Sequence, residues 1–294
     1  MDVNLQTNFL LKQGFACELS VATMFYSSNE AGNQKPIIAK PLFNAFYTPP
    51  NFPFLCAMKL FFIRLIKSGF IKLQLHRIFQ PFTGAFLNLV YLTKLSKWAS
   101  ENKQVEYNDF FSKWDYSKRD GMYEWVINKE DLRQPITYIE FGVAAGHSFK
   151  WWLQQNTAAE SLFVGFDTFD GLPEDWGPFK KGSFSNNNQI PVVKDSRARF
   201  YKGLFQQTLP EFIKNLDNSR RNVIMLDADL FSSTLYALSS LAPYLKKDDI
   251  IFFDEFVVPT HEFKAYQDFI TSHYVNLKLI AAANNYYFVA FKVV

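Results

Sequence analysis

The chain has 294 residues, 48% hydrophobic and 20% charged, a composition that excludes an intrinsically disordered protein. Its two cysteines, Cys17 and Cys56, match no metal-ligand spacing and no disulfide framework, which is typical of a reducing cytosol. The net charge of +3 is spread unevenly, because nine lysines and arginines and no acid lie between Glu30 and Glu101. The basic segment and the more acidic remainder of the chain therefore have different roles.

Residues 1–50 read as an irregular segment, because prolines, glycines and asparagines interrupt any periodicity. Residues 51–115 read as a basic helical extension. Two interpretations of its lysines stay open: a solvated face of a helical subdomain, or a basic amphipathic surface for an anionic membrane or an acidic partner. We expect no secretory signal and no membrane span, since Lys59, Arg64 and Lys67 interrupt the most apolar stretch. The expected location is cytoplasmic, with peripheral membrane contact and self-association left open.

From residue 116 to residue 294 the pattern alternates between strands and helices, after a first charged helix near 116–130. The predicted strands span 136–141, 162–167, 199–202, 223–227, 250–254, 277–281 and 286–292, and the predicted helices span 147–155, 209–215, 233–244 and 262–273. Apolar strands separated by helices indicate a parallel sheet covered on both faces. The last two strands are too close in sequence for a crossover and must form an antiparallel hairpin. We therefore predict a doubly wound, Rossmann-like α/β domain with seven strands, the last antiparallel, as in class I methyltransferases.

The stretch "YIEFGVAAGHS" places a glycine turn after the first strand of this domain. It lacks the middle glycine of the dinucleotide fingerprint and the Gly-Lys-Ser/Thr of a phosphate-binding loop. The remaining pattern, Glu140, Gly142 and Gly146, suits a ligand without phosphate, such as S-adenosylmethionine, whose amino-acid part needs close backbone and a nearby acid. Asp167, at the end of the next strand, is expected to accept hydrogen bonds from the cofactor's ribose.

Several longer strings in the same order carry a more specific resemblance. They are "YIEFGVAAGHSFKWW", "FVGFDTFDGLPEDWG", "FYKGLFQQTLPEF", "MLDADLFSSTLYALSSLAPYLKKDDIIFFDEF" and "HEFKAYQDF". Together they resemble the macrocin O-methyltransferase family of class I S-adenosylmethionine-dependent methyltransferases, which includes members found with surface-polysaccharide genes. The resemblance extends from about residue 96 to the C-terminus and implies an O-methyltransferase.

Four acids follow two adjacent predicted strands, in "MLDADLF" and "FFDEF", and their mutual repulsion would be relieved by a hard cation such as Mg²⁺. The resemblance implies that the ion is held by Asp227, Asp254 and Glu255, the last of which replaces the aspartate usual in the family. In the alternative interpretation Asp229 caps the following helix and Glu255 is merely solvated.

With the ion in place, the acceptor hydroxyl would lose its proton to Asp227, or to His261, which follows the fifth strand. His261 could equally be a structural residue near the start of a helix. Residues 168–197 form a long connection typical of an active-site lid, and the rings of Phe169, Trp176 and Phe179, with Phe184, could stack on a sugar.

We therefore expect an S-adenosylmethionine-dependent O-methyltransferase that acts on a sugar or another hydroxylated small molecule, with Mg²⁺ assistance. Two alternatives remain. The first is methylation of nucleic acid, against which stand the missing base-methylation motif and the lack of a recognisable binding module. The second is a non-catalytic adaptor at the membrane surface that kept the fold.

Overall fold

The structure is a computed structural model that describes residues 54–110 and 113–294. The chain divides into two compact units, residues 1–81 and residues 82–294. The expectations for residues 1–50, Cys17 included, lie outside the described residues. Cys56 is disulfide-bonded, so the expectation that it forms no disulfide is wrong.

The first unit contains α2 and α3, and the second unit contains the α/β fold and the helix that precedes it. The helices are α2 (Phe54–Lys72), α3 (His76–Phe79), α4 (Thr83–Glu101), α5 (Lys118–Lys129), α6 (His147–Gln155), α7 (Phe205–Lys214), α8 (Phe231–Leu241) and α9 (Glu262–His273), with short 3₁₀ helices at Gln80–Phe82 and Ala242–Tyr244. The strands are β1 (Tyr107–Asp109), β2 (Ile136–Phe141), β3 (Leu162–Asp167), β4 (Ala198–Lys202), β5 (Arg221–Leu226), β6 (Ile250–Phe253), β7 (Leu277–Ala283) and β8 (Phe288–Val293). None of the helices within these described ranges is long and apolar enough to cross a membrane.

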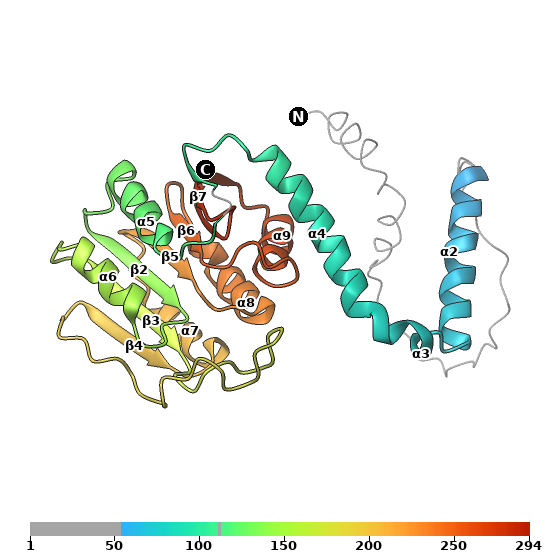
Figure 1. Cartoon of the computed structure of the whole chain (residues 1–294), viewed down its shortest axis with the longest axis horizontal. Helices are drawn as coiled ribbons and strands as arrows, with labels where there is room; N and C mark the ends of the chain where they lie inside the picture. Colours follow the sequence, from blue (N-terminus) through green and yellow to red (C-terminus); the bar gives the residue numbers. More distant parts are fainter. Residues whose placement is uncertain (1–53, 111–112) are drawn as a thin grey trace, which may run out of the picture. The chain divides into compact units, whose positions relative to one another are not determined.

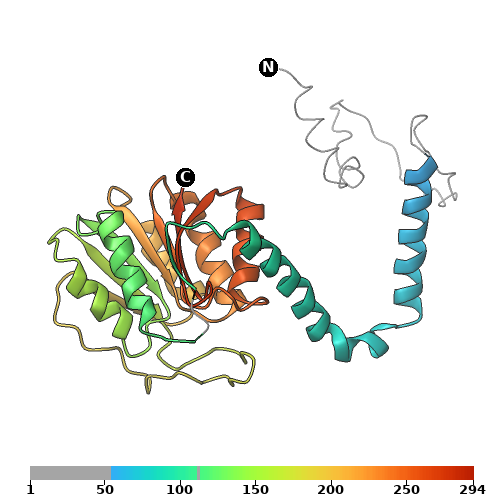
Figure 2. The ribbon, with the colours of Figure 1, turned by 45° about the horizontal axis from the view of Figure 1, so that its top comes forward.

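The second unit is built on one twisted sheet with strand order β1-β7-β8-β6-β5-β2-β3-β4 (Figures 1 and 2). The central strands are parallel, and β8 pairs antiparallel with both β6 and β7. The predicted doubly wound fold with a reversed last strand is therefore confirmed. The sheet has an eighth strand that was not predicted, β1, which pairs with residues 281–283 of β7 at the sheet edge.

Helices cover both faces of this sheet, as the apolar strands require. On one face α7, α8 and α9 bury aromatic and aliphatic side chains against β2, β3, β5 and β6. On the other face α5 and α6 pack against the same strands, with Trp152 and Tyr123 among the fully buried residues. All six residues of β2 are buried, which identifies it as the centre of the core.

The C-terminal half of α4 is part of the hydrophobic core of the second unit. Tyr91, Leu95 and Trp98 are buried there, four and three residues apart on one helix face. The ring of Trp98 lies 4.8 Å from that of Phe256 and 5.4 Å from that of Tyr286. The helix that leads into the α/β fold is thus held by aromatic rings from the segment after β6, from α9 and from the terminal hairpin.

The turn after β2 requires glycine at its first position. Gly142 has φ +90°, a left-handed conformation that side chains rarely adopt. A Cβ atom there would lie 1.7 Å from the backbone oxygen of Asp227, at the end of β5. The ends of β2 and β5 can approach so closely only because residue 142 has no side chain.

Replacing Gly142 by alanine should lower the free energy of unfolding by about 3 kcal/mol or more, since it adds both left-handed strain and a backbone clash. Gly177→Ala is the matched control. Residue 177 also has a positive φ, +52°, but nothing lies within 4 Å of a Cβ there, so only the conformational cost of about 1–2 kcal/mol applies. Equilibrium denaturation of both variants measures the difference, and equal losses would contradict the close approach.

Candidate active site

A cavity of about 920 Å³ lies at the carboxyl ends of the parallel strands, where the fold is expected to bind ligands. Of the residues predicted as site residues, those that line it are Glu140, Gly142, Asp167, Asp227, Asp254 and Glu255. Gly146 is flanked by two lining residues and sets the start of α6, with φ +76°. The structure thus brings the predicted cofactor turn and the predicted acids to one cavity.

The Asp167 carboxylate holds the glycine turn in place. Its Oδ2 accepts hydrogen bonds from the backbone N–H groups of Val143 and Ala144, both at 2.7 Å, and its Oδ1 accepts one from Phe169 N–H at 2.6 Å. A carboxylate has about four acceptor sites, so these three bonds leave room for one further donor. Asp167 is therefore both a structural clamp between β2 and β3 and a residue that faces the cavity.

Glu140 is almost fully buried, and its Oε2 accepts a 2.5 Å hydrogen bond from the hydroxyl of Tyr138. Burial raises the pKa of Glu140 to about 8, and the bond from Tyr138 opposes that rise. Arg119 also opposes it, by its positive charge. A carboxyl group that is protonated near neutral pH therefore lies under the glycine turn.

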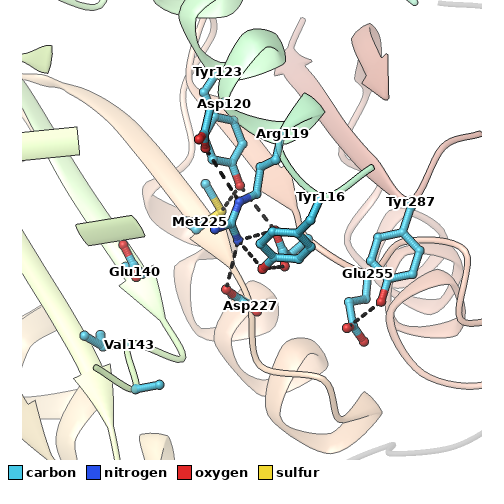
Figure 3. Close-up of polar contacts among 12 residues, drawn as sticks. Tyr116, Arg119, Asp120, Tyr123, Glu140, Val143, Met225, Asp227, Glu255 and Tyr287 are labelled. Atoms are coloured by element: carbon cyan, nitrogen blue, oxygen red, sulfur yellow. Dashed lines mark hydrogen bonds and ion pairs between the residues drawn. The ribbon is translucent and has the colours of Figure 1, made fainter. Parts of the chain in front are cut away.

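Asp254 is held by a basic and aromatic cluster on α5 and just before it, whose members Tyr116, Arg119 and Tyr123 are labelled in Figure 3. Its Oδ1 accepts hydrogen bonds from Arg119 Nη1 at 3.1 Å and from the Tyr123 hydroxyl at 3.3 Å. The same guanidinium lies 3.9 Å from Asp227 Oδ2 and receives support from the Tyr116 ring beneath it, 4.3 Å away. Burial raises the pKa of Asp254, and Arg119 opposes that rise. One guanidinium thus partly compensates two carboxylates.

Asp227 is the acid most open to the cavity in this cluster, with 28% of its side chain exposed against 3% for Asp254. Burial and the neighbouring Asp254 and Asp229 raise its pKa well above the usual range, while Arg119 lowers it. The charge of Arg119 favours the ionised form of Asp227, and the ionised form is the one that can receive a proton from a bound hydroxyl.

The second acidic pair, Asp229 and Glu255, lies beside the first. Burial, followed by the charge of Glu255, raises the pKa of Asp229 to about 8. Burial raises the pKa of Glu255 to about 7, although Tyr287 donates a 2.6 Å hydrogen bond to its Oε1. Helix α8 begins after Leu230 without a side-chain cap, so Asp229 does not cap it.

These carboxylates fit a divalent cation in chemistry but are not arranged as a finished metal centre. Carboxylate oxygens are the donors that Mg²⁺ prefers, and Glu255 Oε2 is buried without a hydrogen-bond partner. Within residues 54–110 and 113–294, however, no group of three or more His, Cys, Asp or Glu side chains is placed to hold a metal ion. The neighbour that compensates Asp254 is Arg119.

His261 is not among the residues that line the cavity. It is the residue before α9, and its Nδ1 accepts a hydrogen bond from the backbone N–H of Phe231 at 3.3 Å. Burial lowers its pKa, which keeps the ring neutral. These contacts match the structural interpretation of His261 better than that of a base.

Aromatic rings from the long connection after β3 form one wall of the cavity. Trp176 and Phe179 stack with their centroids 5.2 Å apart, and Phe184 lies 4.9 Å from Phe179. All three line the cavity. The expectation for Phe169 is wrong: it is 1% exposed, because its backbone, with φ +57°, turns the ring into the core.

A charged helix near 116–130 is expected from the sequence, but its pattern alone gives it no part in the site. Arg119 and Tyr123, on α5, and Tyr116, just before it, are spaced three and four residues apart and face the acids together (Figure 3). This spacing was the available signal. A buried cation opposite carboxylates that follow more than 100 residues later could not be paired from one sequence.

Comparison with known proteins identifies the family. A model of the macrocin-O-methyltransferase (TylF) family matches residues 127–288, more than half of the chain. The chain belongs to this family. As a member of the macrocin-O-methyltransferase family it is an S-adenosylmethionine-dependent O-methyltransferase. No curated protein matches the sequence.

Solved structures with a related fold include CalS11, a calicheamicin methyltransferase, at a TM-score of 0.46 and 21% identity over 60% of this chain and 78% of that chain. The O-methyltransferase NovP aligns at 0.45 and 19% identity, with the same coverage. A putative caffeoyl-CoA O-methyltransferase from Staphylococcus aureus aligns at 0.40 and 14% identity over 69% of this chain and 91% of that chain.

Asp167→Asn should lower the free energy of unfolding by about 2–4 kcal/mol, because an amide nitrogen would face backbone donors and at least one charge-assisted hydrogen bond would be lost. Asp170→Asn, at an exposed position three residues away, is the matched control and should unfold like the wild type. Denaturant titration measures both. A wild-type stability for Asp167→Asn would show that the carboxylate does not hold the turn.

Glu140→Gln should make stability less dependent on pH. The folded pKa of about 8 lies above the unfolded value of 4.5, so the stabilisation is complete below pH 4.5 and is lost as the pH rises to 8. Across that window the wild type should lose about 1.4 kcal/mol per pH unit that the variant retains. Glu160→Gln, at an exposed position, is the control. Parallel stability curves for wild type and Glu140→Gln would refute the assignment.

Proposed function

We propose that this enzyme transfers the methyl group of S-adenosylmethionine to a hydroxyl of a sugar or of another hydroxylated small molecule. The observation that supports this best is the meeting of the glycine turn, Asp167 and Asp227 at one cavity of about 920 Å³. That volume is within the range of small-molecule and cofactor sites, about 300–1,000 Å³.

In this proposal the cofactor lies against the turn between Gly142 and Gly146, with Glu140 beneath its amino-acid part. The Asp167 carboxylate uses its remaining acceptor site for a ribose hydroxyl. Among the described residues that line the cavity, Arg119 is the only lysine or arginine. It is therefore the group available to the cofactor's own carboxylate in a cavity otherwise rich in acids.

The acceptor would bind between the aromatic wall and the acids. The rings of Trp176, Phe179 and Phe184 line this wall, and aromatic rings pack well against the apolar face of a sugar. Placing the acceptor there brings its hydroxyl toward Asp227. The protein then has to align the acceptor oxygen with the methyl carbon and the sulfur, which is mainly a positioning effect.

Asp227 is the proton acceptor in this scheme, in preference to His261. It lines the cavity, its pKa is raised by burial and by its acidic neighbours, and Arg119 holds Asp254 beside it. Mg²⁺ assistance stays part of the proposal. Asp227, Asp254 and Glu255 would hold the ion, which when bound lowers the pKa of the acceptor hydroxyl.

Incubation with S-adenosylmethionine, with and without Mg²⁺, and a panel of glycans and nucleotide sugars tests the function. Mass spectrometry should detect the gain of one methylene on a hydroxylated acceptor. Methylation of RNA alone, or no measurable binding of S-adenosylmethionine, would refute the proposal. A chelator tests the role of Mg²⁺ separately. An undiminished rate of transfer in its presence would exclude Mg²⁺ assistance but leave the proposed methyl transfer intact.

Asp227→Asn should lower the rate of transfer by about 10²–10⁴-fold, since the amide cannot accept the proton. Cofactor affinity should stay within a few-fold, because Asp227 is not one of the residues assigned to the cofactor. His261→Gln should retain most of the activity, and Asp217→Asn, at an exposed position, should retain all of it. Steady-state kinetics and cofactor titration measure these effects. If His261→Gln loses the activity and Asp227→Asn keeps it, the base has been assigned to the wrong residue.

A further inference from the structure

Helix α2 exposes an apolar stripe that nothing within the described residues covers. Met58, Phe62, Leu65 and Ile66 follow one another at positions i, i+4, i+7 and i+8 and therefore share a helix face. They are 42%, 52%, 56% and 65% exposed. Monomeric soluble proteins rarely expose contiguous apolar patches of this kind unless the patch binds something.

The first turns of α4 show the same character. Phe86, Leu87, Leu89 and Val90 are all exposed to about half their surface. The later turns of the same helix bury Trp98 in the catalytic core. Most of the exposed apolar surface of α4 therefore lies in its first turns, and Leu92, beside the buried Tyr91, is 48% exposed.

The charge of this segment indicates what covers these apolar side chains. Residues 54–97 contain no acid, and their cationic residues are Lys59, Arg64, Lys67, Lys72, Arg77, Lys94 and Lys97. A second copy of the segment would bring an equal positive charge against the first, which opposes self-association. A surface of negative charge with an apolar layer beneath it matches both properties, and an anionic lipid bilayer is such a surface.

We propose that α2, Phe54–Lys72, binds the surface of an anionic lipid bilayer. The apolar side chains of α2 enter the boundary between headgroups and acyl chains. Arg64 and Lys67 lie off the apolar stripe of α2 and extend their charged ends toward lipid phosphates. No described helix is long and apolar enough to span the membrane, so the segment lies along the interface. This inference is independent of the proposed methyl acceptor.

Flotation of the full chain with lipid vesicles tests the proposal. The protein should float with vesicles in which about one third of the phosphatidylcholine is replaced by phosphatidylglycerol, and only weakly with phosphatidylcholine alone. Raising the salt concentration should weaken the binding, because it screens the lysines and arginines.

Two double variants separate charge from apolar contact. Arg64→Gln with Lys67→Gln should weaken partition by roughly thirtyfold, as expected for two basic residues near an anionic surface. Phe62→Gln with Ile66→Gln should weaken it at least about tenfold. The matched control is Lys214→Gln with Lys247→Gln, which removes the same charge from exposed sites on the catalytic unit and should leave partition unchanged.

Two results would overturn the proposal. One is the absence of flotation with anionic vesicles while the protein still binds S-adenosylmethionine, which shows that it is folded. The other is an oligomer, seen by light scattering, that the Phe62 and Ile66 changes dissociate while vesicle binding is undetectable. The second result would assign the apolar stripe to a second copy of the chain.

Discussion

The active site depends on the Asp167 carboxylate, which accepts hydrogen bonds from backbone N–H groups. Asp167, at the end of β3, accepts hydrogen bonds from two successive N–H groups of the turn after β2 and one from its own loop. The same turn lies against the end of β5, because Gly142 has no side chain to hold it away. Three strand ends are thereby fixed relative to one another. The glycine turn, Asp167 and the proposed base owe their common location to this arrangement.

The fixed strand ends also force acids together, and the protein compensates them unequally. Asp254 receives a guanidinium and a phenol, Glu255 receives a phenol, and Asp227 shares Arg119 only at 3.9 Å. A repelled carboxylate with incomplete compensation gains by taking up a proton or a cation. Of Asp227 and Asp254, the less compensated is Asp227, which is also the more exposed, and a substrate proton would arrive there.

The sequence was sufficient for the fold because local signals agree with the tertiary structure. Apolar runs ended by acids, together with the glycine turn, predicted β2, β3 and α6 with the bounds observed. Three-residue β1 carries too little periodicity to be predicted, and it exists because β7 offers an edge. Phe169 was assigned to the aromatic wall incorrectly, because its left-handed backbone conformation cannot be predicted from the residue type.

The site was predicted less completely than the fold for a related reason. Residues at strand ends can be brought together by topology alone, and this placed the acids and Gly142 correctly at one cavity. Arg119 comes from a helix that crosses the other face of the sheet, and only three-dimensional packing sets it opposite Asp254. From the sequence alone a charged helix is predicted to be exposed to solvent, because the partner of each charge is not known.

The burial of Trp98 sets the lower limit for an independently folded enzyme. Its ring packs on Phe256, the residue next to Glu255, and on the terminal hairpin through Tyr286. A polypeptide that starts at residue 127, where the family match starts, would lack α4. The rings of Phe256 and Tyr286 would then lose their contact with Trp98, next to Glu255. Such a polypeptide would also lack α5 and its guanidinium. The smallest independently folded enzyme therefore includes α4. A displacement of that helix would act on Phe256, next to Glu255.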